Sequence, residues 1–193
     1  MRGEIMLGME YSQEFEQKWH IAPQFASHPI GKNITIRRAK VSDAQRIQEM
    51  HHRLSRESVF YRYLRPYKPT IEDLEEVCSL GDDEGFVVIA TIDGPKEKVV
   101  GICYYCVEPQ NPASAEPAVL VEDAYQGCGL GKQLLMELSQ NAKRMGVNEF
   151  TCYTHPGNLR VLGMIERSGM PFENRYQQGI QEIRVRLNSI PLQ

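Results

Sequence analysis

The sequence has no apolar run long enough to span a membrane, for which about 18 consecutive apolar residues are needed. Charged residues make up 24% of the chain and interrupt its apolar stretches. The first ten residues also lack the basic segment and apolar core of a secretory signal. We therefore expect a cytoplasmic protein that does not associate with membranes.

Positive charge is not in excess either. The formal net charge is −3 at pH 7, which argues against a general nucleic-acid-binding protein and predicts no nucleic-acid partner. A chain of 193 residues is expected to form one domain with a substantial core. Residues 1–33 show no sustained period, so we interpret them as an extension partly ordered against a domain that spans residues 34–193.

Cysteine is sparse, and its five copies have no disulfide-framework spacing, which favours reduced thiols. Cys103 and Cys106 form a C-x-x-C pattern, but they lie in a β-rich run. Positions three apart in a strand face opposite sides of a sheet, so a redox pair is not predicted. The histidines have no ligand spacing: His51 and His52 are adjacent, and adjacent helical positions diverge. No metal is expected.

The sequence does contain a glycine-rich turn between an apolar run and an amphipathic helix pattern, namely Gln126-Gly127-Cys128-Gly129-Leu130-Gly131-Lys132. Alternate glycines leave backbone amides bare, and the following helix points its positive dipole end at them, which predicts a pyrophosphate site. The spacing does not fit a P-loop, because Gln133 follows Lys132 where a hydroxyl is required. A dinucleotide fingerprint does not fit, because the third glycine comes one residue early.

The pattern reads as Gln-x-x-Gly-x-Gly, and in it the chain resembles the GNAT (GCN5-related N-acetyltransferase) superfamily, in which this loop cradles the pyrophosphate of acetyl-CoA. Within that superfamily, over residues 34–187, it looks most similar to the catalytic domain of bacterial Pat-type protein lysine acetyltransferases, which act on acyl-CoA synthetases. Four stretches carry the Pat-type similarity, and they lie at residues 36–39, 53–58, 61–64 and 115–127.

The predicted elements fit an α/β fold of the GNAT type, with a central, mixed, mostly antiparallel twisted sheet of about seven strands flanked by helices. Strands are expected at 34–38, 86–92, 99–107, 118–121, 148–153, 170–176 and 180–187, and helices at 44–54, 57–64, 70–80, 129–145 and 158–168. The three prolines in residues 108–117 predict a loop over a sheet edge.

The resemblance also implies which residues hold acetyl-CoA. Backbone amides of Gly127, Cys128, Gly129, Leu130, Gly131 and Lys132 would face the pyrophosphate, with Gln126 bracing either the loop or the phosphates. Lys132 either adds charge at the rim or is a solvated helix lysine. The strand of Val119, Leu120 and Val121 would pair with the pantetheine arm and supply an oxyanion amide, and Asn158 would contact CoA or serve as a helix cap.

The resemblance implies Glu116 as the catalytic general base, with Glu122 as the rival and an exposed, solvated glutamate as the structural alternative. Apolar neighbours of Glu116 would disfavour its charged form, and Pro117 could shift its geometry. Many members carry a tyrosine that protonates the leaving thiolate, but Ile165 stands at that position. Tyr153 and Tyr125 are the remaining candidates, although either could simply be packing.

The predicted function is acetyl transfer from acetyl-CoA, by direct attack in a ternary complex, to a protein lysine such as one on an acyl-CoA synthetase. Two alternatives remain open: a small-molecule amine acetyltransferase, and a non-catalytic acyl-CoA-binding sensor of the same fold, which the missing tyrosine favours. Basic residues dominate positions 37–68 and acidic residues positions 72–84, which could dock a protein surface or only keep two helices solvated.

Overall fold

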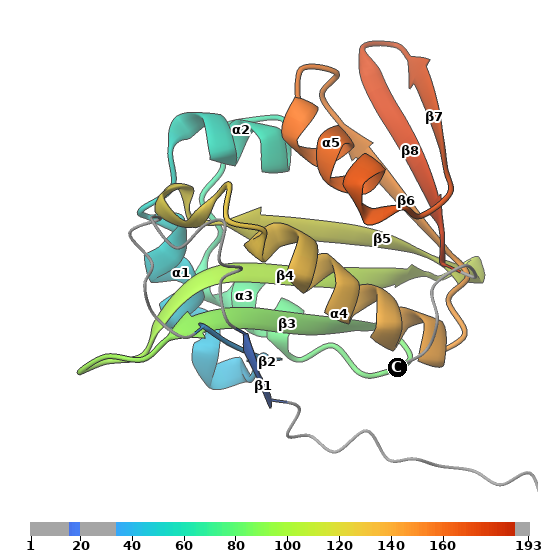
Figure 1. Ribbon diagram of the computed structural model, residues 1–193. Helices are drawn as coiled ribbons and strands as arrows, with labels where there is room; N and C mark the ends of the chain where they lie inside the picture. The colour runs from blue at the N-terminus through green and yellow to red at the C-terminus, as the bar shows by residue number, and fades with distance from the viewer. Residues whose placement is uncertain (1–15, 20–33, 188–193) are drawn as a thin grey trace, which may run out of the picture.

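A computed structural model describes residues 16–19 and 34–187 of the chain (Figure 1). Its strands are β1 (Glu16–Trp19), β2 (Ile34–Arg38), β3 (Gly85–Ile92), β4 (Lys98–Glu108), β5 (Asn111–Val121), β6 (Glu149–Thr154), β7 (Phe172–Gln177) and β8 (Ile180–Arg186). Its α-helices are α1 (Ala44–His51), α2 (Arg56–Tyr63), α3 (Ile71–Cys78), α4 (Leu130–Arg144) and α5 (Leu159–Ser168). None of these helices combines the length and apolar character that a membrane crossing requires.

The described strands form one sheet in the order β1-β2-β3-β4-β5-β6-β8-β7. Every neighbouring pair is antiparallel except β5 and β6, which confirms the predicted mixed, mostly antiparallel sheet flanked by helices. The predicted count of seven strands is wrong, because β1 adds an eighth within the segment interpreted as an extension. Glu16, Gln17 and Lys18 are exposed, so no apolar alternation marks this strand in the sequence. The rest of that segment, residues 1–15 and 20–33, lies outside the described residues.

The prediction of a loop at residues 108–117 is also wrong, because β5 already begins at Asn111. Pro112 lies where the β4–β5 register shifts. Pro117 is paired with Tyr105 of β4, but the backbone of odd-numbered β5 residues faces away from β4, because Glu122 N donates to Val100 O and the pattern alternates. A missing N–H is tolerated on such an open side of a strand.

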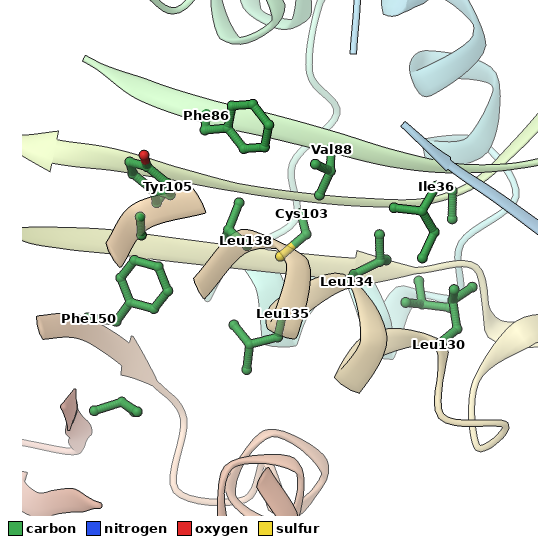
Figure 2. Close-up of a cluster of buried hydrophobic side chains, with 14 of the residues drawn as sticks. Ile36, Phe86, Val88, Cys103, Tyr105, Leu130, Leu134, Leu135, Leu138 and Phe150 are labelled. Atoms are coloured by element: carbon green, nitrogen blue, oxygen red, sulfur yellow. The ribbon is translucent and has the colours of Figure 1, made fainter. Parts of the chain in front are cut away.

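Two apolar clusters hold the helices against the sheet. On one face, leucines of α4 pack over Ile36, Val88 and Cys103, as Figure 2 shows, and Leu130, Leu134 and Leu138 are almost fully buried. On the other face, α1 and α3 cover a second cluster that includes Ile47, Leu74 and Leu120. The sequence period of α4, with apolar residues three and four apart, produces this buried stripe.

The sheet splits between β5 and β6, and this split positions the site. The two strands pair only at Ser114–Glu149 and Ala115–Phe150. Beyond Ala115, β5 continues along β4 to Val121, and β6 continues along β8. The second half of β5 therefore has one side paired and the other side open, while α2 and α5 lie near this opening (Figure 1).

Candidate functional site

A cavity of about 920 Å³ lies at the split between β5 and β6. Its apolar wall comes from α4, α5 and the sheet, with Leu135, Phe150, Val161, Met164 and Ile165 among the lining residues. Its polar wall includes Ser58, Gln126, Asn158, Arg160 and Arg167. A largely apolar hollow of this size with a few polar groups is typical of a small-molecule site.

The open edge of β5 runs along this cavity. Since the even-numbered residues direct their backbone toward β4, the backbone N–H and C=O groups of Val119 and Val121 point to the open side. The carbonyl of Val121 accepts a hydrogen bond from Gln126 Nε2 at 2.9 Å there. Val119, Leu120 and Val121 all line the cavity. An extended ligand could therefore pair with this edge as an added strand would.

The glycine loop and the first turn of α4 form one end of the cavity. Gly127 and Gly129 have φ angles of 80° and 91°, which residues with a Cβ atom rarely adopt. The first helical backbone bond is from Gln133 N to Gly129 O, so the amides of Leu130, Gly131 and Lys132 precede the helical ladder. Together with the helix dipole, these amides form a site for an anion.

The side chains of this loop have separate roles. Cys128 and Leu130 are each 1% exposed and pack into the core, so that only their backbone can reach a ligand. Lys132 is exposed, lines the cavity, and donates from Nζ to the carbonyl of Arg167 at 3.2 Å. The pattern of one buried residue between two open glycines fixes the loop while leaving its amides accessible.

Gln126 connects three elements around the cavity. Its Nε2 donates to Val121 O and to Ser58 Oγ of α2, at 2.9 and 3.1 Å. Its Oε1 accepts from an Arg160 guanidinium nitrogen of α5 at 2.7 Å. This side chain therefore links the β5 edge, α2 and α5 at the mouth of the cavity.

Asn158 caps α5 at the cavity wall. Its Oδ1 accepts from Val161 N at 3.4 Å, and its Nδ2 donates to Thr154 Oγ1 at 3.0 Å. The side chain is buried, and both the cap and the cavity lining are present at once. Ile165, at the position where many GNAT members carry tyrosine, is 3% exposed and contributes an apolar surface to the cavity.

The two glutamates proposed as a base lie in different surroundings. Glu116 is exposed and is paired with Cys106 across β4 and β5, so the apolar burial expected for it is not found. Its neighbour Pro117 lines the cavity. Glu122 is buried and forms ion pairs with Arg53 at 3.0 Å and Lys98 at 2.9 Å. Both oxygens of Glu122 are thereby engaged in anchoring the end of β5.

Two tyrosines were candidates for protonating a leaving group. Tyr153 is 53% exposed and lines the cavity, and its pKa is raised, first by partial burial and then by Glu182. Tyr125 packs under Lys98, whose Nζ lies 5.1 Å from the ring centroid, and it is not part of the cavity wall. A phenol is thus present at the cavity, but on β6 and not on α5.

Several cavity residues escaped the sequence analysis. Arg160 and Arg167 of α5, Tyr61 and Arg62 of α2, and Asp123 after β5 all line it. Asp123 accepts hydrogen bonds from Ser55 N, Ser55 Oγ and Ser58 Oγ, which fastens the start of α2 to the turn before the glycine loop. No spacing rule connects α2 with α5, so these contacts follow only from the fold.

The cysteines do not form a reactive group. Cys103 is fully buried and Cys106 half-buried, and all five thiols are free. Burial raises the pKa of both Cys103 and Cys106, which disfavours the nucleophilic thiolate. Within residues 16–19 and 34–187, no cluster of three or more His, Cys, Asp or Glu side chains could hold a metal ion.

Comparison with known proteins finds acetyltransferases among the relatives of this chain. Acetyltransferase Pat of Mycolicibacterium smegmatis is 27% identical over 139 residues, which are 72% of this chain and 41% of the relative. The chain thus spans less than half of that protein. Among solved structures, the GNAT domain of S. lividans PAT has a TM-score of 0.72 at 24% identity, with 81% of this chain and 92% of that chain covered.

A second solved structure is an acetyltransferase from Salmonella typhimurium determined with its cofactor acetyl-CoA. It has a TM-score of 0.67 at 19% identity, covering 81% of this chain and 95% of that one. These likenesses show the fold. The family model for "Acetyltransferase (GNAT) family" matches residues 47–170, which include β5, the glycine loop and α5. The chain therefore belongs to the GNAT acetyltransferase family.

Proposed function

We propose that acetyl-CoA lies along the open edge of β5 and that the acetyl group is transferred to a lysine side chain of a protein. The continuity of the cavity carries this proposal, because one hollow joins the loop amides to the open backbone of Val119. In this arrangement the pyrophosphate binds the amides of Gly129, Gly131 and Lys132. The pantetheine arm pairs with Val119 and Val121, and Asn158 contacts its amides.

The reaction requires a neutral amine to attack the thioester carbonyl while the sulfur departs as CoA thiolate. The N–H of Val119 points to the open side of β5 and would stabilise the negative charge that develops on the carbonyl oxygen. Alignment of the two substrates by the cavity walls supplies a further part of the rate. Direct attack needs no covalent enzyme intermediate, and the Cys128 side chain is buried in the core.

We assign Glu116 the role of general base, which takes a proton from the lysine ammonium group so that the neutral amine can attack. It lies one residue before the cavity-lining Pro117, on the same strand as the proposed oxyanion amide. Its exposure suits an acceptor that arrives from solvent on a protein surface and completes the site on binding. Catalytic contacts are often formed only in the complex.

The non-catalytic sensor is the second candidate, and the exposure of Glu116 together with the apolar Ile165 favours it. The two candidates differ in whether the bound acetyl group leaves. A small-amine acceptor would use the same chemistry with less contact outside the cavity.

The test is Glu116→Gln, with Glu76→Gln as a matched control on the exposed face of α3. We expect Glu116→Gln to lower kcat for acetylation of lysine-containing proteins by about 100-fold, in the range of general-base effects, with unchanged acetyl-CoA affinity. The control should keep the wild-type rate. Unchanged turnover in Glu116→Gln would remove the base assignment. Tight acetyl-CoA binding by the wild type without transfer to any protein or amine would establish the sensor.

A further inference from the structure

One arginine at the cavity differs from the others that are partly withdrawn from water. Among the described residues, the half-buried arginines are Arg37, Arg38, Arg46, Arg62 and Arg184. Four of them form an ion pair with an aspartate or glutamate. Within the described part of the chain, Arg62 alone of these has no carboxylate within ion-pair distance, and it lines the cavity.

The position of Arg62 is fixed without a negative charge. Its guanidinium donates to the hydroxyl of Tyr104 on β4. It also lies 4.9 Å from the ring centroid of Tyr63 and 5.4 Å from that of Tyr104. Ring faces and a neutral hydroxyl orient a cation but leave its charge uncompensated. A desolvated cation is costly unless a counter-charge arrives, so a ligand anion would pair with a group already in place.

Arg62 acts on the face of the sheet opposite to α4. Tyr104 is paired with Ala118, and Cys106 is paired with Glu116, so these four side chains share one face. Tyr104 packs with the cluster under α1 and α3, whereas Leu130 of the phosphate loop belongs to the cluster under α4. Arg62 is therefore held on the face of the sheet opposite to Leu130, the buried residue of the glycine loop, although both Arg62 and that loop line the same cavity.

Arg62 and the proposed base both lie near Cys106. Burial is the main cause of the raised pKa of Cys106, with Glu116 raising it further and Arg62 opposing it. Ala118 lines the cavity and is paired with Tyr104, which holds Arg62, and it lies two residues from Glu116 on β5, or about 7 Å. The face of β5 that carries Glu116 thus has a negative group where the acceptor amine must react, and the positive group of Arg62 lies about two residues away.

We propose that Arg62 binds an acidic residue located two positions before or after the acceptor lysine. An extended peptide places residues i and i+2 on the same side at about 7 Å, which matches the separation along β5. This inference rests on the proposed acetylation of protein lysine, and it adds a sequence preference that the glycine loop and the base do not supply.

The test uses two peptides that contain one lysine and differ only in having Glu or Gln at both the −2 and +2 positions. For the wild type we expect kcat/KM to be about tenfold higher with the Glu peptide, the scale of one charge-assisted hydrogen bond. Arg62→Gln should bring the ratio of the two peptides close to one, and Arg62→Lys should restore part of it. Arg56→Gln, at an exposed position on the same helix and outside the cavity wall, should keep the tenfold ratio.

Binding of the same peptides to each protein saturated with CoA separates this inference from the proposed function. Selective binding of the Glu peptide that depends on Arg62 supports the inference even if no acetyl group is transferred, and in that case only the proposed transfer fails. Equal binding and equal turnover of both peptides by the wild type overturn the inference. It is also overturned if Arg62→Gln alters the choice between acetyl-CoA and succinyl-CoA and leaves the peptide ratio unchanged.

Circular dichroism and thermal unfolding show whether each variant is folded. Tyr104→Phe removes only the hydroxyl that orients Arg62, and it should lower the peptide ratio.

Discussion

Replacing Gly129 with alanine should weaken acetyl-CoA binding more than it weakens the fold. Gly129 has a φ angle of 91°, and a Cβ added there meets no atom within 4 Å. The cost to stability is therefore backbone strain alone, about 1 to 2 kcal/mol. The added methyl group would also occupy the space in front of the loop amides. Loss of one hydrogen bond to a charged phosphate costs about 1.5 to 3 kcal/mol, or roughly 10- to 150-fold in affinity.

Gly146, at the other end of α4, offers a matched control. Its φ angle is 86°, and an added Cβ there also meets nothing within 4 Å, but it does not line the cavity. Gly146→Ala should cost a similar amount of stability and leave acetyl-CoA affinity unchanged. Urea unfolding gives the stability of both variants, and calorimetric titration gives their Kd for acetyl-CoA. If Gly129→Ala and Gly146→Ala have the same Kd, the loop amides do not bind the pyrophosphate.

Three further predictions concern the framework of the site. Burial lowers the pKa of His51 to about 4, below the unfolded value of about 6.5, so the folded protein loses stability as the pH falls. At pH 5 the loss in unfolding free energy is about 2 kcal/mol relative to pH 8. His51→Phe should remove that part of the pH dependence in urea unfolding. Although burial alone raises the pKa of Asp43, hydrogen bonds from Arg37 and Lys40 hold it below its usual range, and Asp43→Asn should cost about 3 kcal/mol or more in unfolding free energy; a loss below 1 kcal/mol would contradict a structural role for this ion cluster. Asn158→Ala should cost about 1 kcal/mol through loss of the α5 cap and should raise the Kd for acetyl-CoA, whereas an unchanged Kd would leave Asn158 as a cap alone.

The sequence was sufficient to predict the parts of the fold that depend on local pattern. The apolar stripe of α4, the glycine turn before it and the closing hairpin of β7 and β8 are all read from residue spacing. The mixed, mostly antiparallel sheet came from the family resemblance, because strand pairing between distant segments leaves no local signal. The same resemblance directed attention to β5, the glycine loop and Asn158, which the structure brings to one cavity.

Other features could not be predicted for physical reasons. Pro112 and Pro117 suggested a loop, yet Pro112 lies where the β4–β5 register shifts, and Pro117 lies on the open side of β5, which accepts a residue that cannot donate. Glu116 is exposed although apolar neighbours in the sequence suggested burial, because burial depends on which elements cover its face of the sheet, and no residue pattern records that. Arg62 belongs to a segment rich in basic residues, and only the ion pairs of Arg37, Arg38 and Arg46 distinguish it from them.

In the proposed reaction, this cavity holds acetyl-CoA and delivers its acetyl group to protein lysine. In the most direct experiment, the purified protein and radioactive acetyl-CoA are incubated with whole-cell lysate proteins, and the label is then located by mass spectrometry. We expect label on lysine Nε atoms, stable to hydroxylamine as an amide must be, and a labelling rate reduced about 100-fold by Glu116→Gln. Tight binding of acetyl-CoA with no labelled protein, or label found only on cysteine, would contradict it.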